Sequence, residues 1–177
     1  MREVGLVGRG HDPVARLRGS LLELTEFVRS LSSGEWSFHP AEGWSIPENC
    51  EHVLLVEKAV AEQLPKLTDS EPLEPQFASE LEERMVAGVP VAKSKFTAPE
   101  PFRPTGVVVD REAFLAEFSR VRNGIIALAE ADPGRWLRVR VTHPFLGVMD
   151  GRHRMLNVAL HLERHLRQME RVRERVG

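Results

Sequence analysis

The segment from Arg152 to Arg175 constrains the fold most, because its apolar residues recur at spacings of three and four. Such spacing places apolar side chains in one stripe along an α-helix, and a stripe of this kind has to be buried against another surface. The chain must therefore fold so that other elements cover one side of a long terminal helix, which Asp150 or Gly151 precedes. The stripe consists of Met155, Leu156, Ala159, Leu162, Leu166, Met169 and Val172.

Two further segments show the same spacing between clear helix boundaries. The first begins at Asp12, a suitable N-cap before Pro13, and ends near residues 32–34. The other begins at Asp110 and ends before Asp132. We expect both to be amphipathic helices. Their apolar residues are Val14, Leu17, Leu21, Leu24, Val28 and Leu31 in the first, and Phe114, Phe118, Val121, Ile125 and Leu128 in the other.

The segment from Ser45 to Pro65 predicts a helix that carries an inward histidine. Ser45 fits the N-cap, and Glu48 three residues later completes a capping box. His52 shares a face with the apolar residues of this helix, so we expect it to point into the protein. Leaving a buried imidazole without a partner costs about 1–3 kcal/mol, so His52 requires hydrogen bonds or a metal ion.

The stretch between Pro65 and Asp110 carries seven prolines, counting Pro65, and has no sustained period. We expect a long connection with a short helix at residues 78–85, and connections of this length often line a functional site. Three aromatic residues are expected to hold it against the helices: Phe77, Phe96 and Phe102.

Shorter elements are expected between the helices. Residues 36–40 contain a helix-breaking proline and predict a loop. Residues 136–141 alternate weakly, which predicts a short extended piece, and residues 143–147 predict a turn. Taken together, these patterns predict an all-α fold: a four-helix bundle with a long connection between the second and third helices, in a single domain of residues 1–177.

Composition excludes several classes of function. The formal net charge of −2 gives no electrostatic reason to expect a nucleic-acid partner, and no apolar run is long enough to span a membrane. Cys50 is the sole cysteine, so neither an intramolecular disulfide nor a thiolate-rich zinc site can form. We expect Cys50 to be a small buried apolar residue. No signal peptide is evident, and we expect a soluble cytoplasmic protein.

A pair of histidines on the terminal helix is the candidate functional feature. His161 and His165 are four residues apart and therefore point in the same direction from the helix. With His52 from a facing helix they would give three imidazole ligands and an open fourth position. Three protein ligands are typical of a reactive metal site, whereas a structural zinc site has four.

Several neighbours of these histidines have competing interpretations. Capping explains Glu48 better than a role in the site does. Asn157 could orient an imidazole, and Gln168 is as well explained by solvent exposure. Arg164 could neutralise an anionic substrate, although helical arginines mostly lie on the surface. His143 is more easily explained as a packing or capping residue. Three histidines are expected in loops or near termini without a functional cluster: His11, His39 and His153.

The chain resembles a known family over nearly its whole length. The segment Trp44-Ser-Ile-Pro-Glu-Asn-Cys-Glu-His52, the turn His143-Pro-Phe-Leu-Gly147 and the terminal His161-Leu-Glu-Arg-His165-Leu-Arg-Gln168 are similar to motifs of the DinB-like superfamily of bacterial metal-binding four-helix bundles. The resemblance implies that His52, His161 and His165 bind zinc or nickel. It also implies, for some relatives, thiol-dependent S-transferase activity with low-molecular-weight thiols. The segment from residue 66 to 110 matches none of these motifs, so the substrate is not specified.

Three functions follow as alternatives. The first is a metal-dependent transferase or hydrolase acting on a small molecule, with a low-molecular-weight thiol as co-substrate. The second is a non-catalytic metal-binding or stress-response protein in which the cation joins two helices. The third is a helical interaction module whose histidines are ordinary polar residues. Homodimer formation is left open in all three.

Overall fold

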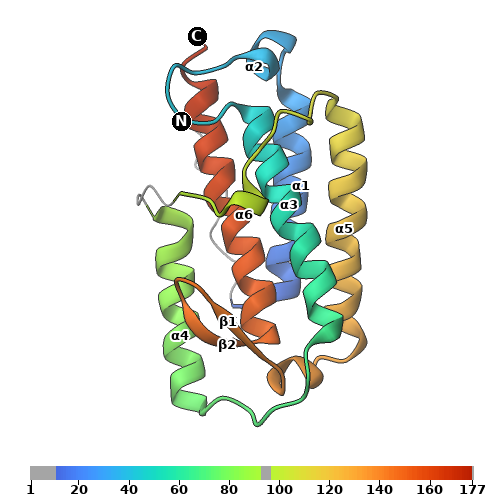
Figure 1. The fold of residues 1–177 in the computed structure, drawn as a ribbon, viewed down its shortest axis with the longest axis vertical. Helices are drawn as coiled ribbons and strands as arrows, with labels where there is room; N and C mark the ends of the chain where they lie inside the picture. Colours follow the sequence, from blue (N-terminus) through green and yellow to red (C-terminus); the bar gives the residue numbers. More distant parts are fainter. Residues whose placement is uncertain (1–10, 93–96, 177) are drawn as a thin grey trace.

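Four long helices dominate the computed structural model, which describes residues 11–92 and 97–176. They are α1 (Pro13–Ser30), α3 (Ile46–Gln63), α5 (Arg111–Ala131) and α6 (Gly151–Arg173), and they run side by side (Figure 1). α1 and α3 each pack against both α5 and α6. The prediction of a mostly helical fold is confirmed.

Each long helix begins at an N-cap that the sequence offered, with Asp150 rather than Gly151 at α6. Side-chain oxygens of Asp12, Asp110 and Asp150 accept hydrogen bonds from backbone N–H groups in the first turns of α1, α5 and α6. At α3, Ser45 and Glu48 form a reciprocal capping box. A cap of this kind contributes about 1 kcal/mol, and here it fixes where α3 starts and hence where His52 lies.

Apolar residues of the four helices form two buried clusters, one toward each end of the molecule. The stripes read from the sequence account for most of these residues, because spacings of three and four keep side chains on one helix face. The fully buried members include Leu17, Leu24, Val28, Ile46, Val60, Phe118, Ile125, Met155, Leu162 and Met169.

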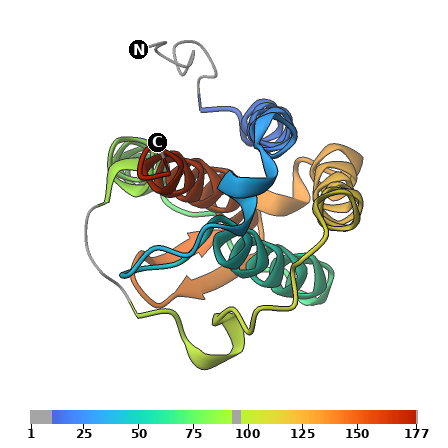
Figure 2. The same cartoon turned by 90° about the horizontal axis from the view of Figure 1, so that it is seen from above.

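The connection between α3 and α5 contains more helix than the sequence predicted. The helix expected at residues 78–85 extends over Pro75–Gly88 as α4, flanked by the 3₁₀ turns η1 (Leu64–Lys66), η2 (Val89–Val91) and η3 (Glu100–Phe102). α4 lies outside the four long helices and packs against α6 (Figure 2). Phe77 is 42% exposed and does not hold the connection down, and Phe96 lies outside the described residues.

A two-stranded antiparallel hairpin precedes α6, a feature that the sequence predicted only in part. After η4 (Arg135–Leu137), β1 (Arg140–His143) pairs with β2 (Gly147–Asp150). Gly147 has a φ of 78° at the end of the predicted turn, a conformation that favours glycine. The hairpin packs against α6 (Figure 1). Its inward residues Val141 and Met149 join a third apolar cluster with Leu81 and Met85 of α4.

The loop predicted at residues 36–40 was wrong in its first part, because α2 (Ser33–Ser37) is a short helix there. A capping box between Ser32 and Glu35 starts it, and the Trp36 Nε1–H donates to the Val109 carbonyl over 3.0 Å. The backbone N–H of Ser32 and the side chain of Arg173 lower the pKa of Glu35 to about 2. α2 thus joins the end of α6 to the segment before α5.

Two buried ion pairs cross the interior, and nothing in the sequence pattern predicted them. Arg122 of α5 is fully buried and donates through Nε to Glu57 of α3 over 3.0 Å and through Nη1 to the Ser20 hydroxyl of α1 over 2.8 Å. Arg16 of α1 pairs with Glu163 of α6 at 3.0 Å. These contacts tie all four long helices together. Within the described ranges, no helix has the length and apolarity to cross a membrane.

Candidate metal centre

His52 points into the protein from α3, as the sequence predicted, and is 6% exposed. Its Nδ1 lies 2.7 Å from the carbonyl oxygen of Phe102 in η3. Because a carbonyl oxygen only accepts hydrogen bonds, Nδ1 carries the proton and Nε2 presents a lone pair. The connection between α3 and α5 therefore fixes the tautomer of His52. The Phe102 carbonyl is the atom through which this connection contacts the histidine cluster.

His165 of α6 is held by Asn49, which lies one turn before His52 on α3. Asn49 Oδ1 is 2.9 Å from His165 Nδ1, while Asn49 Nδ2 donates to the Ser45 carbonyl, also over 2.9 Å. The Ser45 contact fixes which end of the amide faces His165, so His165 Nδ1 donates and its Nε2 is free to bind a metal. The sequence analysis missed Asn49. Its position three residues before His52 was the available signal.

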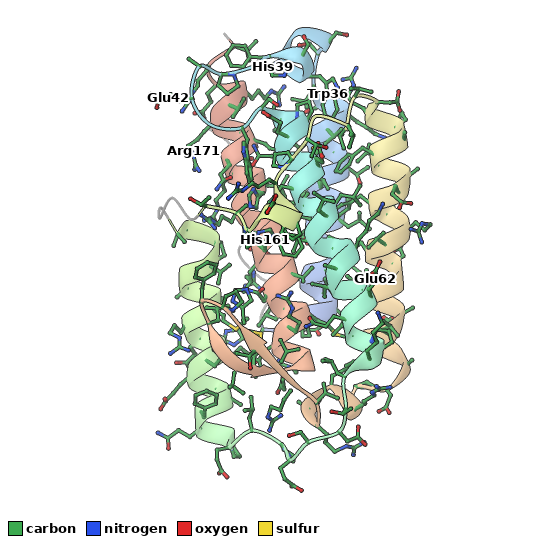
Figure 3. All side chains as sticks on the ribbon, viewed as in Figure 1. Trp36, His39, Glu42, Glu62, His161 and Arg171 are labelled. Carbon is green, nitrogen blue, oxygen red and sulfur yellow. The ribbon has the colours of Figure 1, made fainter. Side chains whose placement is uncertain are left out.

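His161 completes the cluster one turn before His165, about midway along α6 (Figure 3). Its Nε2 lies 3.3 Å from Nε2 of His52. One ligand nitrogen from each of the three rings lies within 4.8 Å of the others. The structure thus brings together the three histidines that the sequence singled out, with His161 as the more exposed member.

This geometry fits a tetrahedral cation. Two nitrogens on bonds of about 2.05 Å at a tetrahedral angle are separated by about 3.3 Å, which agrees with the His52–His161 distance. The cluster contains no carboxylate or thiolate, so all three ligands would be neutral. In a metal-free state the same 3.3 Å contact requires one Nε2 to donate a hydrogen bond to the other.

Burial keeps the three rings in the form that binds metals. It lowers the pKa of His52, and it lowers the pKa of His161 and His165 well below the usual value. The mutual repulsion of the rings and the charge of Arg164 act in the same direction. The imidazoles are therefore neutral at pH 7, and metal binding need not displace a proton from them.

Trp44 covers one side of the cluster from the turn before α3. Its ring centroid lies 4.8 Å from that of His52 and 6.3 Å from that of His165, with the latter pair stacked. An indole face in this position is apolar and limits access of water from that side. Of the three rings, His161 is the one that is not fully buried.

Glu51, the neighbour of His52, does not belong to the histidine cluster but binds backbone N–H groups of the connection between α3 and α5. Its carboxylate accepts hydrogen bonds from the backbone N–H groups of Thr105, Gly106 and Val107 over 2.7–3.1 Å, and it is 3% exposed. Burial acts to raise its pKa, but these hydrogen bonds outweigh burial and the net shift is downward. Glu51 thus binds the segment that follows η3. This segment in turn keeps the Phe102 carbonyl in position against His52. The sequence analysis missed this role.

The other candidates have structural roles. Glu48 caps α3, as expected, and Asn157 bonds to Arg154 rather than to a histidine. His143 Nδ1 accepts from the backbone of the hairpin turn. Cys50 is fully buried, which raises the pKa of its thiol, and its Sγ lies 3.7 Å from Met169 Sδ.

The expectation for His153 was wrong. It is 1% exposed in the first turn of α6, with Nδ1 2.6 Å from Asp150 and Nε2 3.0 Å from the carbonyl of Ala78 in α4. The sequence analysis placed His153 in a loop or near a terminus, without a functional cluster around it. His153 instead joins α4 to α6.

Fold and site together define a helical protein with a buried three-histidine cluster suited to a metal ion. The family model of the DinB superfamily matches residues 16–169, and the chain belongs to that superfamily. The comparisons with curated proteins and with solved structures gave no match.

Proposed function

We propose that His52, His161 and His165 bind one divalent cation, zinc or nickel, in a four-helix bundle, with a fourth coordination position open to a ligand. The observation that carries this proposal is the convergence of three neutral imidazole nitrogens within 4.8 Å. His52 and His165 are each held by a hydrogen bond at Nδ1, so each presents the lone pair of its Nε2 atom to a metal. The superfamily assignment supports the same conclusion.

The proposal extends to a metal-dependent enzyme of the thiol S-transferase or hydrolase type. A cation held by three neutral ligands keeps its full charge and lowers the pKa of a coordinated water or thiol. The chain itself supplies the orientation: Asn49 and the Phe102 carbonyl hold two rings, and Trp44 excludes water on one side. The substrates we propose are a low-molecular-weight thiol and a small-molecule acceptor.

The second candidate is a structural metal in a non-catalytic protein. The observation that favours it is the burial of His52 and His165, which come from two helices that a cation would join. In that case the metal stabilises the fold and exchanges no ligand at a fourth position.

Metal content tests the site itself. Protein purified without an affinity tag should contain one equivalent of zinc or nickel by elemental analysis, and His161→Ala should contain less than about a tenth of that. His39→Ala is the matched control, because His39 is exposed and lies outside the cluster. Wild-type protein that carries no metal and takes none up would overturn the proposal.

Ligand exchange separates the two candidates. In nickel-loaded protein, a thiol that enters an open position produces a sulfur-to-nickel charge-transfer absorption, and turnover is then sought with a panel of electrophiles. Absence of this band with every thiol tested, together with a melting temperature that falls on chelation, would favour the structural metal.

A further inference from the structure

Arg154 of α6 leaves most of its hydrogen-bonding capacity unused by the residues that the structure describes. Its Nη1 donates to Asn157 Oδ1 over 3.1 Å, and its Nε is buried without a partner. The carboxylate that acts on it is Glu57, which is already paired with Arg122. Burial lowers the pKa of Arg154 to about 10, so the guanidinium is still cationic at neutral pH. A half-buried cation with a buried, unpartnered Nε favours an anion as its partner.

The guanidinium is directed toward the histidine cluster. Asn157 lies one turn after Arg154 on α6, and His161 lies one turn after Asn157, so all three share a helix face. The hydrogen bond to Asn157 draws the long side chain along this face toward His161. The charge of Arg154 acts on His161, which is consistent with this direction. Two helix turns, about 10.5 Å along the axis, separate the two residues.

His143 contributes a second donor from the hairpin. Its Nδ1 accepts hydrogen bonds from the backbone N–H groups of Phe145 and Leu146 over 3.2 and 3.3 Å. Burial, followed by the charge of Arg154, lowers the pKa of His143 to about 4, so the ring is neutral at pH 7. A neutral imidazole that accepts at Nδ1 carries its proton at Nε2, which has no hydrogen-bond partner within residues 11–92 and 97–176.

Asn157 contributes a third donor. Its Oδ1 is occupied by Arg154, so its Nδ2 hydrogens face the other way, and the side chain is 6% exposed. Arg154, His143 and Asn157 therefore offer N–H groups from two elements, and the acceptor atoms of the His143 and Asn157 side chains are already used. A site composed only of donors and a cation selects an anionic group, and a guanidinium binds a planar carboxylate through two parallel hydrogen bonds.

We infer that Arg154, His143 and Asn157 form a carboxylate-binding subsite beside the histidine cluster. The carboxylate subsite itself does not depend on the proposed metal site. Only the ligand that would also bind the metal ion rests on that proposal. A molecule that binds the cation through a thiolate and carries a carboxylate several bonds away would occupy both places at once. The thiol substrate proposed above is thereby specified as an acidic thiol with its carboxylate on a flexible arm.

The first test uses metal-free protein and hexanoate, with hexan-1-ol as the uncharged comparison. In an NMR titration, hexanoate should shift the Arg154 Nε–H signal, and Arg154→Met should weaken hexanoate binding about 10- to 100-fold. Arg138→Met is the matched control, since it removes the same charge from an exposed arginine, and it should leave the affinity unchanged. Equal affinity of wild type and Arg154→Met, or no preference for hexanoate over hexan-1-ol, would overturn the subsite.

A second readout separates ligand binding from a structural role. If Arg154 is a half-buried cation without a carboxylate of its own, Arg154→Met should raise the melting temperature of ligand-free protein by about 2–4 °C, since an apolar side chain has no charge to desolvate. If Arg154 instead stabilises the fold, the same variant should melt at a lower temperature, and the inference fails.

The third test loads wild-type protein with nickel and compares 6-mercaptohexanoate with 6-mercaptohexanol through the charge-transfer band. The acid should bind about 10- to 100-fold more tightly, and Arg154→Met should remove this preference while binding the alcohol as wild type does. If the loaded protein binds neither thiol, the proposed open metal site is wrong, and the hexanoate titration decides the carboxylate subsite independently. If it binds both equally, the two-ended ligand is wrong.

Discussion

The hydrogen bonds of Asn49 show how one residue prepares a metal ligand. Its amide nitrogen is held by the Ser45 carbonyl, and this leaves its oxygen facing His165 Nδ1 at 2.9 Å. His165 can then present only its Nε2 to a metal. Partners of this kind typically contribute 10- to 100-fold to metal affinity, because without them the ring rotates or adopts the other tautomer.

We therefore expect Asn49→Leu to retain one metal per chain with an affinity about 10- to 100-fold lower, measured by competition with a chelator of known affinity. Glu62→Gln is the control, because Glu62 is an exposed residue of α3 outside the three-histidine cluster. An unchanged affinity in Asn49→Leu would show that helix packing alone orients His165.

Cys50 gives a prediction at the same scale. It is fully buried, and burial raises the pKa of its thiol, so its thiolate is scarce even in mildly alkaline solution. Native protein should react with a thiol reagent far more slowly than unfolded protein, and a change from pH 7 to pH 9 should accelerate the native reaction only through unfolding. Rapid reaction of the native thiol at pH 9 would contradict this burial.

Residue spacing predicted the ligands but not their partners. The i, i+4 pair and the inward His52 follow from helix geometry, which depends on local sequence. The Phe102 carbonyl on His52 depends on where a chain segment 50 residues away is placed, and a backbone carbonyl leaves no mark in the sequence. Asn49 is an intermediate case. Its position on the same face of α3 as His52 could be predicted from the sequence, but its hydrogen bond to His165 could not.

At the scale of elements, Glu51 binds the segment after η3 to α3. We expect Glu51→Gln to destabilise the protein by about 1–3 kcal/mol in urea denaturation, because it weakens a buried acceptor that binds three backbone N–H groups. Amide exchange should accelerate at residues 105–107 first. Glu62→Gln is the control, since Glu62 is an exposed residue of α3 (Figure 3).

The stabilisation that Glu51 contributes should decrease as the pH falls. The pKa of Glu51 is lower in the folded protein, so its contribution is complete above the unfolded pKa of about 4.3 and is lost as the pH falls through the folded value. The stability difference between wild type and Glu51→Gln should therefore be constant from pH 7 to pH 5 and shrink below that. A difference that grows under acid conditions would contradict the downward shift.

The long helices were predictable as elements, whereas α2 was not predicted and the β1–β2 hairpin was predicted only in part. N-caps and apolar spacing are local signals, and they placed the starts of α1, α3, α5 and α6 correctly. α2 and the β1–β2 hairpin depend on distant contacts, such as Trp36 with the Val109 carbonyl. An isolated helix or hairpin of this length is marginal in water, so its sequence need not show a strong pattern.

At the scale of the whole molecule, the fully buried Arg122 links α5 to α3 and α1 through Glu57 and Ser20. Burial acts to raise the pKa of Glu57, while the guanidinium favours its charged form. Arg122→Met would remove the cation and leave a carboxylate in the interior, which typically costs 3–5 kcal/mol. If the chain folds as the single domain that the sequence predicts, the loss should appear across all four long helices as one cooperative transition.

The double variant Arg122→Met, Glu57→Leu separates the ion pair from general packing. If the pair contributes mainly by compensating its own burial, replacing both partners with apolar residues should restore most of the stability lost in Arg122→Met. Calorimetry of wild type, both single variants and the double variant measures the coupling directly. A double variant no more stable than Arg122→Met would mean that the hydrogen bonds from Arg122 to the Leu17 carbonyl and the Ser20 hydroxyl hold α1 in place. Arg122 would then stabilise the packing of α1 rather than that of α3.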